Sequence, residues 1–105
     1  MARLIVTVAA RDDLGGIIDY LETHAGTAVA MRYAVEFDAA LNRISEFPAL
    51  GSPRPELGPG TRLVVVSPYL VLHEHRSADE TAVVLRVLDG RRNITGAPAA
   101  TLNTC

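Results

Sequence analysis

The sequence contains no lysine, no tryptophan and only one cysteine, Cys105, among its 105 residues. All ten cationic side chains are arginines, which excludes mechanisms that need a lysine base, a lysine Schiff base or a P-loop lysine. A single cysteine forms neither an intramolecular disulfide nor a thiolate zinc site, and it fits a reducing cytosol, so a cytoplasmic protein is expected. No run of about 18 apolar residues is present, so neither a membrane span nor a membrane partner is expected.

The rest of the composition is that of one globular domain. Hydrophobic residues make up 49% of the chain, charged residues 21%, and the formal net charge is −2. A chain of this length builds one core without a metal or disulfide, so a single domain over residues 1–96 is predicted, with residues 97–105 as a loosely held tail. A chain with a net negative charge is expected to bind nucleic acid poorly, because affinity for phosphates grows with the number of cationic contacts. Direct sequence-specific binding to nucleic acid is not expected either.

Hydrophobic periodicity predicts a strand followed by two helices. A β-branched run over residues 4–8 indicates the strand. Apolar residues at helical spacing then predict one helix from Ala9 to Gly26 and a second from Thr27 to Phe47. Gly26 is the expected end of the first helix, since glycine commonly follows a helix C-terminus. The two helices are therefore expected to form a helical hairpin.

The second half of the chain is predicted to be a meander of strands. After a loop rich in proline and glycine at residues 48–60, three strand-like runs follow: Arg62–Ser67, Tyr69–Arg76 and Ala82–Asp89. The predicted fold class is α+β, in the order β-α-α-β-β-β, with the helical hairpin packed on one face of a small, mainly antiparallel sheet. Strict alternation in the last strand predicts two faces, one with Val83, Leu85 and Val87 and the other with Val84, Arg86 and Leu88.

Two features of the first helix call for an explanation. Gly15 and Gly16 each lower its stability by about 1 kcal/mol relative to alanine, so another backbone is expected to pack closely there. Asp12 and Asp13 are expected near the start of the helix, where carboxylates interact favourably with the helix dipole. Paired carboxylates at such a position are not expected to be catalytic.

Several motifs in a fixed order carry a family resemblance. They are Ala10-x-x-Asp13-Leu14-x-x-Ile17-x-x-Tyr20, Leu50-Gly51-x-x-Arg54, Arg62 seven residues before Tyr69, and the run from Val84 to Asn93. With these motifs on these elements, the chain resembles the RelE/ParE superfamily of toxins from bacterial type II toxin–antitoxin systems, and its ParE branch in particular.

The resemblance implies a small cytosolic toxin, held inactive in a hetero-oligomer by a cognate antitoxin that is ParD-like or similar. ParE-like members poison DNA gyrase without chemistry of their own, whereas RelE-like members cut mRNA on the ribosome. Similar proteins often have histidine in place of Asp89 and tyrosine in place of His73, and the nucleases use a basic cluster that includes lysines. Gyrase is therefore the favoured target, with no catalytic residue and no cofactor. The alternatives are a RelE-like, ribosome-dependent mRNA endonuclease and a degenerate toxin that only binds its antitoxin.

Arg62, Arg91 and Arg92 are the arginines expected to contact the target. Their guanidinium groups pair with phosphate or carboxylate oxygens, and all three are expected near the open end of the sheet. The alternative for Arg91 and Arg92 is a solvated pair partly neutralised by Asp89. An unpaired charge within an apolar strand is costly, so Arg62 and Arg86 either emerge on the open face or pair with an acid such as Glu74.

His73 and His75 are the only residues whose spacing resembles a metal site. Alternate residues of a strand project to the same face. Zinc needs three or four protein ligands, however, so no metal is expected, and the pair is predicted to be solvated or at the edge of the core.

Val29, Met31 and Val35 lie outside the main apolar stripe of the second helix. Exposed apolar residues that cluster on a surface usually contact a partner. These three are therefore the predicted antitoxin contacts.

Overall fold

The computed structural model describes residues 2–93, and side chains as far as Arg91, so the predicted tail at 97–105 lies outside the described residues. The elements are β1 (Arg3–Val6), α1 (Val8–Ala25), α2 (Thr27–Glu46), β2 (Ser52–Pro53), the 3₁₀ helix η1 (Pro55–Leu57), β3 (Thr61–Val66), β4 (Tyr69–Arg76), β5 (Thr81–Asp89) and α3 (Gly90–Asn93). The predicted order is confirmed, with three short elements added: β2 and η1 within the proline-rich loop, and α3 after β5.

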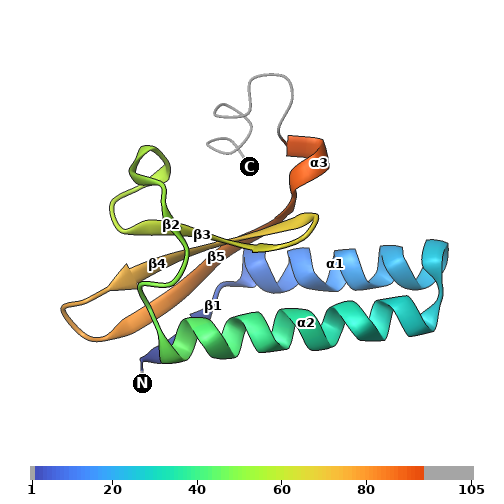
Figure 1. The fold of residues 1–105 in the computed structure, drawn as a ribbon, viewed down its shortest axis with the longest axis horizontal. Coiled ribbons are helices and arrows are strands. Elements are labelled where there is room, and N and C mark those ends of the chain that lie inside the picture. Colours follow the sequence, from blue (N-terminus) through green and yellow to red (C-terminus); the bar gives the residue numbers. More distant parts are fainter. Residues whose placement is uncertain (1, 94–105) are drawn as a thin grey trace.

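The helical hairpin of α1 and α2 covers one face of a five-stranded sheet (Figure 1). The strand order is β1-β5-β4-β3-β2; β1 runs parallel to β5 and the other neighbours are antiparallel. The predicted α+β class is thus confirmed. Among the described residues, no helix is both long and apolar enough to cross a membrane.

The core lies between the hairpin and the sheet. Alanines at positions 10 and 40 are fully buried and let the helices approach the strands closely. Tyr69 packs edge-on against Tyr33, with ring centroids 5.5 Å apart, and lies 5.5 Å from the ring of Phe37. This aromatic cluster joins α2 to the start of β4.

Thr7 starts α1 by capping it. Its side-chain oxygen accepts a hydrogen bond from the Ala10 backbone N–H at 3.0 Å and donates one to the Leu85 carbonyl at 3.0 Å. The helix therefore begins at Val8, and its first turn contains no acid. The expectation that Asp12 and Asp13 lie at the helix start is wrong, since both belong to the second turn.

A bulge in β5 breaks the predicted alternation of side chains. Leu72 pairs with Arg86, but the next residue, His73, pairs with Val84, so Leu85 is an extra residue. Val84 and Val87 consequently both join the core beneath the helices. The assignment of these two valines to opposite faces was wrong, because one inserted residue reverses the facing of everything after it.

The glycine pair in α1 is not explained by close packing. Apart from the backbone of α1 itself, no described atom lies within 4 Å of the place that a Cβ would take at Gly15 or Gly16, so the predicted close approach of another backbone is wrong for the described residues. Both residues are exposed.

Replacing Gly15 by alanine is expected to stabilise the protein by about 1 kcal/mol, because alanine restricts the unfolded chain and meets no neighbour in the helix. The midpoint of thermal unfolding should rise by about 4–8 °C. Gly26→Ala is the contrasting variant: its φ of 97° is unfavourable for alanine, so that midpoint should fall. A lower midpoint for Gly15→Ala would contradict this account.

Candidate functional site

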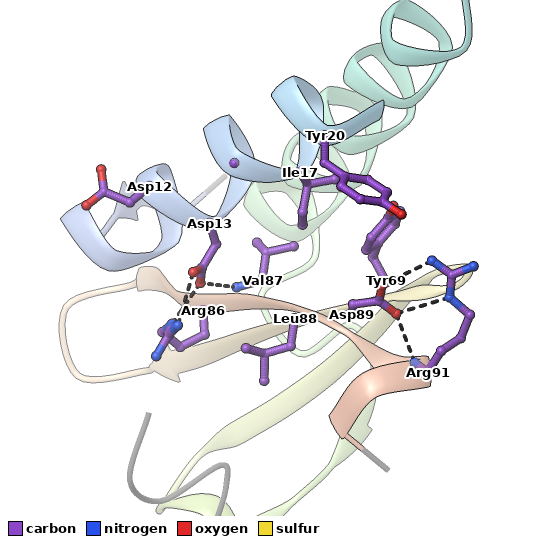
Figure 2. A pocket seen from close by; sticks show the side chains of 11 residues that line it. Asp12, Asp13, Ile17, Tyr20, Tyr69, Arg86, Val87, Leu88, Asp89 and Arg91 are labelled. Atoms are coloured by element: carbon purple, nitrogen blue, oxygen red, sulfur yellow. Dashed lines mark hydrogen bonds and ion pairs between the residues drawn. The ribbon is translucent and has the colours of Figure 1, made fainter. Parts of the chain in front are cut away.

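A cleft of about 970 Å³ separates α1 from the C-terminal half of β5; it is called the α1–β5 cleft below (Figure 2). The helix contributes Asp12, Asp13, Gly16, Ile17 and Tyr20. The sheet and α3 contribute Tyr69, Arg86, Val87, Leu88, Asp89 and Arg91.

The cleft exists because β1 is too short to cover β5. The parallel pairing ends where Val6 meets Val84, and beyond this point β5 faces the helix α1 instead of a strand. The Asp13 carboxylate takes the place of a strand partner, since its Oδ2 accepts a hydrogen bond from the Val87 backbone N–H at 2.9 Å. A backbone donor at the sheet edge is thereby satisfied by a helix side chain.

Asp13 also holds Arg86 in a two-bond ion pair. Nε of Arg86 donates to Oδ2 at 2.7 Å and Nη2 donates to Oδ1 at 3.0 Å, with side-chain exposures of 28% for Arg86 and 17% for Asp13. Arg86 is thus paired with an acid, one of its two predicted alternatives. The acid is Asp13; Glu74 instead pairs with Arg76, 2.8 Å away.

A second ion pair lies at the other end of the cleft. Asp89 Oδ1 accepts hydrogen bonds from the backbone N–H of Arg91 at 3.0 Å and from its Nε at 3.2 Å, and Oδ2 accepts one from Nη2 at 3.0 Å. This bonding raises the pKa of Arg91 further above its ordinary value. The suggested neutralisation by Asp89 is observed for Arg91. The side chain of Arg92 lies outside the described part.

Two tyrosines that sequence reasoning did not single out as site residues line the middle of the cleft. The pKa of the Tyr69 phenol is raised, first by burial and then by the negative charge of Asp89, so the hydroxyl stays protonated at neutral pH. Tyr20 on α1 is 55% exposed and stacks on His24, with ring centroids 4.2 Å apart. The spacing of Asp13, Ile17 and Tyr20, at i, i+4 and i+7, was the available signal that they share one helix face.

Arg62 does not lie with Arg91, contrary to expectation. It pairs with His73, four residues along β4 from Tyr69, whereas Asp89 pairs with Tyr69 itself. Four residues of strand separate the two positions by roughly 13 Å along β4. The Nη1 group of Arg62 donates to the Gly51 carbonyl at 3.0 Å and so holds the loop that follows α2.

His73 is part of the core rather than a solvated residue. It is fully buried, and its Nε2 lies 2.8 Å from the Leu50 carbonyl, to which it donates. Its Nδ1 has no partner, and burial is the main reason that the pKa of His73 is lowered. Within residues 2–93 no three histidine, cysteine or acidic side chains group together in a way that could hold a metal ion.

The protein is expected to lose stability as the pH falls below about 6.5. The unfolded chain takes up a proton at His73 near its ordinary pKa, while the folded chain, whose pKa is lower, does so only at more acid pH. Stability is therefore fully present above pH 6.5 and declines toward the folded pKa, by at most about 1.4 kcal/mol per pH unit. Urea unfolding at pH 7.5 and 5.5 measures this slope. In His73→Gln the free energy of unfolding should depend less on pH. An unchanged pH dependence would show that other groups cause it. His24→Gln, at an exposed position, is the control and should keep the pH dependence of the wild type.

The three predicted antitoxin contacts do not share one face of α2. Met31 and Val35 are 64% and 67% exposed, and one helical turn apart they form a continuous apolar surface. Val29 is half-buried. It precedes Met31 by two residues, which turn a helix by about 200°, so the two side chains leave the helix in nearly opposite directions. The structure thus brings Met31 and Val35 together and separates Val29 from them.

A family model and a known protein that are similar to this chain both belong to the ParE toxins. The family model for the ParE toxin of the type II toxin–antitoxin system parDE matches residues 4–94. Toxin ParE3 of Caulobacter vibrioides is 36% identical over 94 residues, which cover 90% of this chain and 92% of that protein.

Solved structures show the same fold. The chromosomal ParDE system from P. aeruginosa matches with a TM-score of 0.70 at 21% identity, over 85% of this chain and 96% of that one. The toxin–antitoxin complex RelBE2 from Mycobacterium tuberculosis matches with a TM-score of 0.56 at 29% identity, over 84% and 96%. The resemblance drawn from the motifs is confirmed.

Proposed function

This chain belongs to the ParE family of toxins of type II toxin–antitoxin systems, and on that basis we propose that it acts on DNA gyrase. In this proposal the toxin binds gyrase while the enzyme holds cut DNA, and prevents religation. It does so by binding alone, in the cytoplasm, and a cognate ParD-like antitoxin neutralises it in a hetero-oligomer.

The pairing of the cleft arginines with carboxylates is the observation that favours this function over RNA cleavage. A ribonuclease needs cations directed at the scissile phosphate and a general base within reach of the attacking hydroxyl. Here Asp13 engages Arg86 and Asp89 engages Arg91, while His73 is buried against the Leu50 carbonyl. Such an arrangement suits recognition of a protein surface better than phosphate chemistry.

An antitoxin partner is supported by the exposed apolar surface of α2. Met31 and Val35 present a surface that fits the apolar face of an amphipathic helix. The similar solved structures are themselves a ParDE system and a RelBE2 toxin–antitoxin complex. We therefore retain Met31 and Val35 as proposed antitoxin contacts, and we leave Val29 out of this surface because it lies on another side of α2.

The proposal is tested with purified gyrase, supercoiled plasmid and ATP. Adding the toxin should convert plasmid to linear DNA once detergent and protease are applied, and toxin premixed with its antitoxin should not. A parallel translation reaction should leave its mRNA intact. Cleavage of mRNA at ribosomal positions would establish the RelE-like alternative. Antitoxin binding with neither activity would establish a degenerate toxin.

A further inference from the structure

We propose that Asp89 is a positioning residue, which holds the Arg91 guanidinium in the orientation that binds the target. This role rests on the proposed function for the identity of the target and on the expected contact of Arg91 with it. Its physical basis is the contrast between how exposed Arg91 is and how firmly it is bound, together with the rigid backbone that carries both residues.

Arg91 combines high exposure with several hydrogen bonds. Its side chain is 65% exposed, more than those of the other ion-paired arginines in the described chain. Three hydrogen bonds nevertheless join it to the Asp89 carboxylate, from its backbone N–H, its Nε and its Nη2. Arg32, at 63%, lies 3.8 Å from Glu36, too far for a hydrogen bond. An exposed ion pair adds little to stability, so stability does not account for the bonding of Arg91.

The backbone around Asp89 fixes the place of both side chains. Asp89 ends β5 and pairs with Tyr69 of β4, which is only 3% exposed. Gly90 then donates a backbone hydrogen bond of 2.9 Å to the Pro68 carbonyl, and a Cβ at Gly90 would lie 2.8 Å from that oxygen. This close approach brings the Arg91 side chain back beside the Asp89 carboxylate (Figure 2). Side chains on such a framework hold their positions more precisely than side chains on a loop.

The bonds to Asp89 leave part of the guanidinium available. Asp89 occupies the Nε edge, while Nη1 of Arg91 forms no hydrogen bond within the described part of the chain. Nη1 and the second N–H of Nη2 form the outer edge of the guanidinium, which can donate two parallel hydrogen bonds to a carboxylate. A side chain that is already held loses less entropy on binding, which is worth about two- to tenfold in affinity. The group that this edge fits best is a carboxylate on the surface of the target protein.

A rival role for Asp89 is to weaken the contact, because its charge neutralises Arg91 and repels a carboxylate of the target. Repulsion between exposed charges is screened by water and salt. The loss of side-chain entropy is not screened. Positioning therefore outweighs repulsion, and the two roles predict opposite effects on target binding when Asp89 loses its charge.

The variant Asp89→Asn tests the positioning. Asparagine keeps an oxygen that can accept from the Arg91 backbone N–H, but it loses the charge and places a donor where Nη2 needs an acceptor. In the isotope-labelled toxin, the NMR order parameter of the Arg91 Nε–H bond should be close to that of a rigid backbone, about 0.85, and fall below about 0.6 in Asp89→Asn. The control is Arg43, which is exposed and whose side chain forms no hydrogen bond or ion pair within the described residues. Its order parameter should stay below about 0.6 in both proteins.

The second measurement is the amount of toxin that halves the growth rate after graded induction without antitoxin. Asp89→Asn should require about fivefold more toxin than the wild type. In the Arg91→Ala background, adding Asp89→Asn should change this amount by less than about twofold, because no guanidinium is left to position. Glu74→Gln is the matched control, since Glu74 pairs with Arg76 at the same spacing near the other end of β4. It should leave the amount unchanged.

The proposal is overturned if Arg91 is as mobile as Arg43 in the wild type, if Asp89→Asn is as toxic as the wild type or more so, or if the loss of toxicity is equally large when Arg91 is alanine. A wild-type chain that never slows growth would overturn it too, since Arg91 then has no target to bind. The gyrase cleavage assay is independent of these readouts. Growth arrest without linear DNA rejects the proposed function and leaves each of these outcomes as decisive for Asp89 as before.

Discussion

Replacing Asp13 by alanine is expected to lower the free energy of unfolding by about 3 kcal/mol. The substitution removes both hydrogen bonds to the Arg86 guanidinium and the one to the Val87 N–H. It leaves a largely buried cation and a backbone donor without their carboxylate partner, and breaking one side of a buried pair typically costs about 3–5 kcal/mol. We expect a loss at the lower end of this range because 28% of the Arg86 side chain is exposed, so water can partly solvate its charge. Urea unfolding measures the effect directly.

Asp12→Ala is the matched control for this prediction. It removes a carboxylate from the neighbouring position, which is exposed and forms no ion pair within the described part of the chain. The change in unfolding free energy should stay within about 0.5 kcal/mol. Replacing Arg86 by methionine in the Asp13→Ala background should recover part of the loss, since the largely buried charge that has lost its Asp13 carboxylate is then gone. Equal effects of Asp12→Ala and Asp13→Ala would show that the ion pair does not stabilise the fold.

Joint replacement of Arg91 and Arg92 by alanine is expected to abolish toxicity without unfolding the protein. Charged contacts that become desolvated in an interface are strong, and losing two should weaken target binding at least about thirtyfold. The Arg91 side chain is 65% exposed, so its pairing with Asp89 adds little to stability. Growth after induction without antitoxin, together with the gyrase cleavage assay, measures the effect, and circular dichroism verifies folding.

The control is a double variant of α2, Arg32→Ala with Arg43→Ala. This variant also removes two arginines and so changes the net charge by the same amount. Both positions are exposed and lie on α2, outside the lining of the cleft. It should remain fully toxic. If the Arg91/Arg92 variant still stops growth, these two arginines have no part in target binding. If both double variants lose toxicity, net charge rather than position is responsible.

Arg62→Ala separates a structural arginine from a functional one. Its guanidinium holds the Gly51 carbonyl, next to the Leu50 carbonyl held by His73. The two contacts fasten consecutive residues of one loop to β3 and β4. Arg62→Ala is therefore expected to lower the free energy of unfolding, because the loop loses one of its two anchors. A role of Arg62 in target binding would instead lower toxicity and leave the free energy of unfolding unchanged.

Local patterns in the sequence determined the elements and the fold class. Apolar periodicity gave the positions of both long helices, and Gly26, with a φ of 97°, separates them as its position predicted. Runs of β-branched residues separated by turn residues gave β3, β4 and β5 to within a residue at each end. These signals are readable because each depends on residues within one or two turns of the chain.

Only the tertiary structure decided which residues form the cleft. The bulge at Leu85 depends on pairing with β4, and it places Val84 and Val87 on the same face. Asp13 finds Arg86 across 73 positions of sequence because β1 stops at Val6 and leaves the edge of β5 facing α1. Arg62 and Arg91 lie apart because the register of β3 and β4 carries Arg62 to the other end of the strand. Pairing register and strand length are properties of two chain segments together, so no pattern within one segment could predict them.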